Sequence, residues 1–176
     1  DPILFSKAGM TPLHVAVRHC HLELAHELLH YITQTKSRID AVMLVNQQNW
    51  EGETPVHYAA EITKNMAHNE FEDTDIMKLL LSYDGDTSIH TKLTHETPLH
   101  YCARAGNEDI LLEMVKHIGP DMVQVAVNKQ AKNGWSPLLV ASEQGHVEIV
   151  KILLQHHARV DVFDEAHGKA ALHLAA

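Results

Sequence analysis

The sixteen histidines of this chain are the side chains best suited to chemistry, because imidazole binds metal ions and transfers protons near neutral pH. The densest group is His19-Cys20-His21, followed by His26 and His30, which share one face of an expected helix. Zinc sites normally show cysteine and histidine in compact pairs at defined spacings, and this group does not match them. The sequence therefore predicts no metal site and no bound cofactor.

Catalysis finds no better support in the sequence. It contains no glycine-rich phosphate loop and no nucleophile motif, and the carboxylates near histidines fall on ordinary helix surfaces. We therefore expect no enzyme and no catalytic residue. The two cysteines, Cys20 and Cys102, are far apart and indicate no disulfide framework, which fits a reducing cytosol. Cys102 is expected to be a small buried hydrophobe.

Several of the other histidines belong to a motif that recurs along the chain. It reads Thr-Pro-Leu/Val-His at Thr11–His14, Thr54–His57 and Thr97–His100, with weaker copies at Ser136–Leu139 and Ala170–His173. Self-similarity at this period predicts a stacked repeat array in place of one closed globule. Such an array favours binding over catalysis.

Each motif carries the residues that begin a helix. The threonine or serine hydroxyl suits the N-cap, and proline suits the first helical position. Gly106 and Gly145 suit a left-handed helix stop, whereas Cys20 takes that place in the first unit, at a cost of about 1 kcal/mol if it must be left-handed. A second, amphipathic helix follows, with its apolar stripe expected at Leu24, Leu28, Leu29, Val147, Val150, Leu153 and Leu154.

At these residues the chain resembles the ankyrin-repeat family, most clearly over Asn133–Leu154. The resemblance covers essentially the whole chain. It implies an all-α solenoid of stacked helix pairs with projecting β-hairpin fingers. It also implies that the motif histidine bridges the threonine hydroxyl and backbone groups of a neighbouring unit. The structural motif residues are Thr11, His14, Thr54, His57, Thr97, His100, Ser136 and His173.

We interpret residues 1–176 as a single stack and as a fragment of a longer array. The repeats are expected at about 6–48, 49–91, 92–130, 131–164 and, in part, 165–176. Thr11, Thr54 and Thr97 are spaced 43 residues apart, against about 33 for a standard unit. The extra residues fall in three inserts, at 31–46, 61–75 and 117–128.

The first and third inserts have similar sequences, Asp40–Asn46 and Asp121–Asn128, and each is expected to form a short extra helical turn beside a finger. The insert between the helices of the second repeat is acidic, with Glu61, Glu70, Glu72, Asp73 and Asp75. It is either a solvated, mobile loop or a docking site for a basic partner.

The order of these irregular repeats resembles the cytoplasmic array of NOMPC-type mechanosensory TRP channels. That resemblance implies a non-catalytic interaction and tether segment on the cytoplasmic side of the plasma membrane, linking a mechanically gated cation channel to microtubules. Its partners would be the flanking repeats and, through the full array, the cytoskeleton. The alternative is a cytosolic ankyrin adaptor or inhibitor that binds a folded protein through its concave face and fingers.

Charge and hydropathy exclude two other classes of partner for this segment. The formal net charge is −9, and no Lys/Arg cluster is long enough to follow a phosphate backbone, so we expect no nucleic-acid binding. No run of 18 apolar residues occurs, so this segment is not expected to span a membrane.

Positions that vary freely in ankyrin repeats give the candidate protein contacts. Of the two tryptophans, Trp50 is the better candidate for an exposed anchor, because tryptophan is enriched at binding hot spots, and Trp135 is expected to be a packing residue at a finger base. The full set of candidate contacts is Arg18, His19, Trp50, Glu51, Glu53, Glu61, Leu93, Thr94, Glu96, Arg104, Lys132, Asn133, Trp135, Glu143 and Gln144.

Overall fold

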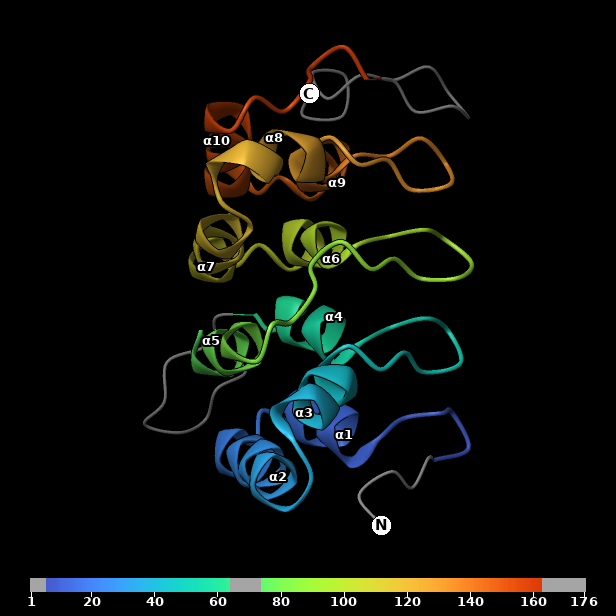
Figure 1. Cartoon of the computed structure of the whole chain (residues 1–176). Coiled ribbons are helices and arrows are strands. Elements are labelled where there is room, and N and C mark those ends of the chain that lie inside the picture. The colour runs from blue at the N-terminus through green and yellow to red at the C-terminus, as the bar shows by residue number, and fades with distance from the viewer. Residues whose placement is uncertain (1–5, 64–73, 163–176) are drawn as a thin grey trace.

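A computed structural model of the chain describes residues 6–63 and 74–162. The partial fifth repeat, with its motif histidine His173, lies outside the described residues. So does most of the acidic insert of the second repeat, including the stretch that was expected to be mobile. The described part forms a stack of helical layers from which loops project on one side, as Figure 1 shows.

Each of the four layers is a pair of helices. The inner helices α1, α4, α6 and α9 pack on one another along the stack, and an outer helix packs on each of them. The pairs are α1 (Pro12–Arg18) with α2 (Leu22–Thr35), α4 (Pro55–Ala60) with α5 (Asp75–Ser82), α6 (Pro98–Ala105) with α7 (Glu108–Ile118), and α9 (Pro137–Gln144) with α10 (Val147–Gln155). The all-α solenoid of stacked helix pairs is confirmed.

Two further helices, α3 (Arg38–Val45) and α8 (Pro120–Val127), occupy the first and third inserts. The sequence predicted a single helical turn at each place, and the structure has eight residues in both, or about two turns. They follow α2 and α7 and pack on them.

The asparagine that ends each extra helix fastens it to the next layer. Asn46 donates from Nδ2 to the backbone oxygen of Asp84 over 2.9 Å, and its Oδ1 accepts from the backbone N–H of Asp86 over 2.7 Å. Asn128 makes the same pair of bonds to the oxygen of His157 and the N–H of Arg159, over 3.0 and 2.8 Å. One side-chain amide thus satisfies two backbone groups of a turn in the next layer.

The inner helices begin and end as the motif predicts. Thr11, for example, caps α1 and Pro12 fills its first position. Gly106 and Gly145 end α6 and α9 with φ of 77° and 74°, and Cys20 stands at the equivalent place after α1 with φ of 55°. Cys20 is therefore left-handed, which is the condition under which the sequence assigned it a cost of about 1 kcal/mol.

The apolar stripe predicted for the outer helices is buried only in part: Leu29 and Leu153 are fully buried. Leu24 is 49% exposed, and Val147 and Leu154 are exposed too, whereas Ile149, which the predicted stripe did not include, is buried. Each outer helix packs both on its own inner helix and on the outer helix of the next layer, for example α5 on α7. These two neighbours together determine which face of an outer helix is buried. Sequence periodicity alone predicted that face only in part.

The loops that project from the stack, here called fingers one to four, span residues 6–10, 49–53, 91–96 and 131–135. Two backbone N–H···O bonds close each finger; in finger two, Asn49 donates to the oxygen of Glu53 over 2.8 Å and Gly52 donates to that of Asn49 over 3.1 Å. The sequence led us to expect β-hairpins, but the described residues contain no β-strand. Both bonds of a finger involve its first residue, so no ladder of paired residues continues beyond it.

Candidate protein-interaction surface

The motif histidines join each layer to the finger of the next. In the first layer, the Nδ1 of His14 accepts from the backbone N–H of Thr11 over 3.1 Å and from the Thr11 hydroxyl over 2.8 Å. Because Nδ1 accepts an N–H bond it carries no proton, so the proton is on Nε2. That Nε2–H donates to the backbone oxygen of Glu53, 3.2 Å away.

The same link recurs in the second and third layers. His57 donates from Nε2 to the backbone oxygen of Glu96 over 3.3 Å, and His100 donates to that of Trp135 over 3.0 Å. The fourth layer has Leu139 in this place, and Ser136 retains only the cap bond from the Leu139 N–H. The three links form a series that runs from layer one to layer four.

These histidines are buried and neutral. Desolvation by burial lowers the pKa of His57 and of His100 to about 4, and it lowers the pKa of His14 as well. Both ring nitrogens already have partners, so neither can bind a metal or shuttle a proton without breaking the link. Their role in the described structure is to hold layers together.

A half-buried carboxylate joins finger two to two inner helices. The carboxylate of Glu53 accepts from the hydroxyl of Tyr58 over 2.5 Å, from the Nδ2 of Asn49 over 2.9 Å and from the hydroxyl of Tyr101 over 2.8 Å. Burial alone would raise the pKa of Glu53, but these three bonds outweigh it and lower the pKa. Burial and the nearby carboxylate raise the pKa values of both tyrosines.

Two arginines stack on these tyrosines. The guanidinium of Arg18 lies 5.8 Å from the Tyr58 ring centroid, and that of Arg104 lies 5.4 Å from the Tyr101 ring centroid, within the range of cation–π attraction. Arg104 also forms an ion pair with Glu96. We call Arg18, Glu53, Tyr58, Glu96, Tyr101 and Arg104 the tyrosine cluster.

The tyrosine cluster brings together four candidate contacts, namely Arg18, Glu53, Glu96 and Arg104. Sequence reasoning missed Tyr58 and Tyr101. A signal was present, because each tyrosine directly follows a motif histidine, and both therefore occupy the same position in successive repeats.

The remaining candidates fall into two groups. Trp50, Glu51, Leu93, Thr94, Lys132 and Asn133 lie in the fingers, whereas His19, Glu61, Glu143 and Gln144 are exposed at the ends of inner helices. Trp50 is 63% exposed, yet its ring covers Gly9 so closely that a Cβ there would lie 2.7 Å from it. Trp135 is half-buried against the core, as expected of a packing residue.

Within residues 6–63 and 74–162, no three His, Cys, Asp or Glu side chains are grouped so that they could hold a metal ion. The paired rings of His26 and His30 have centroids 6.1 Å apart. Cys102 is fully buried, and burial raises the pKa of its thiol. Among the helices of the described part, none is long and apolar enough to cross a bilayer.

Comparison with known sequences agrees with the geometry. The family described as ankyrin repeats (3 copies) matches residues 40–124 and 111–176, and the single ankyrin repeat matches residues 8–34. An ankyrin repeat-containing protein of Arabidopsis thaliana is 37% identical over 92 residues, which are 51% of this chain and 17% of that protein.

Two regulatory proteins are also similar to this chain. The phosphate system positive regulatory protein PHO81 of Saccharomyces cerevisiae is 26% identical over 94% of the chain and 14% of its own length. The neurogenic locus notch homolog protein 1 of Homo sapiens is 28% identical over 76% of the chain and 5% of its own length. The chain thus spans less than a fifth of each relative named here.

Proposed function

We propose a function from the premise that the chain belongs to the ankyrin-repeat family, whose repeats mediate protein–protein interactions. The proposed function is that of a non-catalytic interaction segment that carries load from one end of a longer array to the other. The repeat boundaries given above, and the continuation of the array beyond residues 1–176, are part of this proposal. No cofactor and no catalytic residue are assigned.

The observation that carries the proposal is the series of histidine links. His14, His57 and His100 each connect one layer to the backbone of the next finger, and Asn46 and Asn128 connect the extra helices to following layers. In a stack where each repeat contacts only its neighbours, axial force acts on these interfaces in turn. Many small interfaces in series give extension in small steps.

The finer proposal is that the array tethers a mechanically gated cation channel to microtubules, on the cytoplasmic side of the plasma membrane. It is supported by the order of the inserts, two of which are extra helices after the first and third outer helices. None of the three relatives named above is described as a channel, so the resemblance of the sequence is what supports this step.

A cytosolic adaptor or inhibitor is the second candidate. It is favoured by the tyrosine cluster, whose arginines are held on aromatic rings and so present an ordered, polar face to a folded partner. The two candidates differ in the full-length protein, because only a channel carries transmembrane helices beyond its repeats.

Cosedimentation of the full repeat array with microtubules tests the tether proposal. We expect the array to pellet with microtubules at physiological salt and to remain in the supernatant without them. An array that stays in the supernatant with and without microtubules would contradict the tether and would favour the adaptor.

A further inference from the structure

The tips of the fingers present equivalent residues in a row. Backbone hydrogen bonds between neighbouring fingers align these tips. The N–H groups of Trp50, Lys92 and Lys132 donate to the backbone oxygens of Ala8, Glu51 and Thr94, in that order, over 2.8–3.1 Å. Each donor residue directly follows the first residue of its finger, and the residue in that place in finger one is Lys7. The row is therefore Lys7, Trp50, Lys92 and Lys132.

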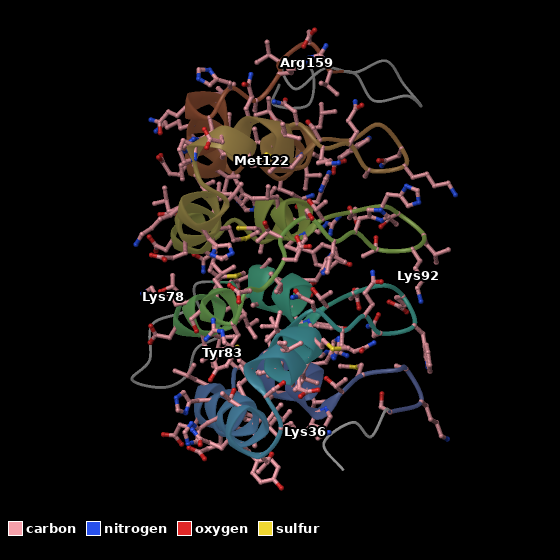
Figure 2. All side chains as sticks on the ribbon, in the orientation of Figure 1. Lys36, Lys78, Tyr83, Lys92, Met122 and Arg159 are labelled. Atoms are coloured by element: carbon pink, nitrogen blue, oxygen red, sulfur yellow. The ribbon has the colours of Figure 1, made fainter. Side chains whose placement is uncertain are left out.

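This row has the opposite charge to the chain as a whole. Three of its four positions are lysine, all three are exposed, and the chain carries a formal charge of −9. Figure 2 shows Lys92 at the end of its finger, on the side away from the helices. The ammonium group of Lys92 lies 3.3 Å from the backbone oxygen of Trp50, so it is held across two neighbouring fingers.

The most exposed large apolar side chain of the described part, Leu93, directly follows Lys92 of this row. Finger three runs from Thr91 to Glu96 and is one residue longer than the others, and the extra length carries Leu93, which is 75% exposed. Beside it an open hollow of 300 Å³ lies between fingers three and four, lined by Leu93, Thr94, Glu96, Ala131, Lys132 and Asn133. Leu93 and this hollow place apolar surface next to Lys92 and Lys132.

We propose that the finger row binds an extended acidic segment of a partner protein, with carboxylates on Lys92 and Lys132 and an apolar side chain in the hollow beside Leu93. This inference rests on the proposed interaction function and names the chemistry of the partner. An acidic segment with an apolar side chain complements both the charge of the lysines and the apolar hollow, whereas the lysines would repel a basic segment.

The spacing of the fingers sets the spacing of the partner's carboxylates. Each finger contributes two backbone segments, bonded within the finger and to the next one. At about 4.8 Å per segment, equivalent residues of adjacent fingers, such as Lys92 and Lys132, are therefore about 10 Å apart. A polyproline II segment rises about 3.1 Å per residue and repeats its side-chain direction every three residues. A glutamate at every third position therefore places carboxylates at about 9 Å intervals along one side.

The experiment uses a fluorescein-labelled peptide in which glutamate, leucine and proline repeat in that order, titrated with the whole chain and followed by fluorescence anisotropy. We expect saturable binding that weakens as salt rises. The double variant K92E/K132E is expected to bind about tenfold more weakly, since two attractions become repulsions. Leu93→Ser is expected to weaken binding about threefold, with little change in salt dependence.

The matched control is K36E/K116E, which changes the net charge equally at exposed lysines that lie after α2 and on α7. It should change the affinity less than twofold. Equal weakening by both double variants, or equal binding of a peptide with lysine in place of glutamate, would overturn the proposal. If the array fails to pellet with microtubules, only the tether proposal is contradicted. If this peptide fails to bind, only the finger-row proposal is contradicted.

Discussion

The hydroxyl of Tyr101 donates to the carboxylate of Glu53 over 2.8 Å, although the two residues are 48 positions apart in the sequence. The bond joins the inner helix of layer three to finger two. Tyr58, in layer two, donates to the same carboxylate over 2.5 Å. One half-buried carboxylate therefore couples three structural elements that neighbouring repeats contribute.

Removing the Tyr101 hydroxyl should lower the free energy of unfolding. We expect Tyr101→Phe to cost about 1–2 kcal/mol, because the Glu53 carboxylate loses one of three charge-assisted bonds in a half-buried site. Urea titration at pH 7 measures the change. The control is Tyr31→Phe on α2, which is exposed and should cost almost nothing; equal costs for both variants would contradict the role of the cluster.

The motif histidines should matter more to stability than exposed histidines do. We expect His57→Ala and His100→Ala each to cost about 1–3 kcal/mol, since both leave buried threonine and carbonyl groups without partners. His117→Ala on α7 is the matched control, because that side chain is exposed. Indistinguishable urea midpoints for all three variants would show that the links carry no energy.

Stability should fall as the solution becomes acidic between pH 6.5 and 4.5. Burial lowers the folded-state pKa of His57 and His100 to about 4, while the unfolded chain titrates near 6.5. The unfolded state therefore binds more protons in this window, and the stabilisation present above pH 6.5 is lost as pH falls toward 4. Complete loss amounts to about 3 kcal/mol for each histidine.

Urea titrations at several pH values across this window measure that slope. Glu53 contributes at lower pH, because its pKa is depressed in the folded state and its stabilisation is lost only as pH falls through that lowered value. His100→Gln, which cannot titrate, should flatten the slope. A free energy of unfolding that stays constant from pH 6.5 to 4.5 would be incompatible with neutral buried histidines.

Cys20 should be a site where glycine stabilises the chain. Its φ of 55° strains a residue with a Cβ, so Cys20→Gly is expected to raise the free energy of unfolding by about 1 kcal/mol. The reverse test is Gly145→Ala, which should cost about the same, because no atom lies within 4 Å of the added Cβ and only backbone strain remains. A change in melting temperature of the same sign in both variants would contradict the role of backbone strain at these two positions.

Local chemistry explains what the sequence could predict. Thr11, Pro12 and His14 act within one turn of helix, so their spacing already specifies the cap and the orientation of the histidine ring. The bridge from this histidine to a neighbouring unit was implied by the resemblance to the ankyrin-repeat family. The left-handed Cys20 was predictable for the same reason, since its place is fixed by the helix that ends before it.

Features that depend on two neighbouring layers were not predictable in this way. The stripe that includes Leu24 was assigned from periodicity, but burial there depends on which outer helix lies beside it. The bond from Tyr101 to Glu53 arises only when layer three stacks on finger two. Likewise, the equivalence of Trp50 with Lys92 and Lys132 follows from bonds between fingers, because finger three has one residue more than finger two.

Force spectroscopy on the whole chain held by its two ends is the decisive test of whether the histidine links pass load from layer to layer. We expect extension in layer-sized steps, with His57→Ala lowering the force of the steps and His117→Ala leaving every step unchanged. Extension in one step, or equal step forces in the original chain and both variants, would contradict it.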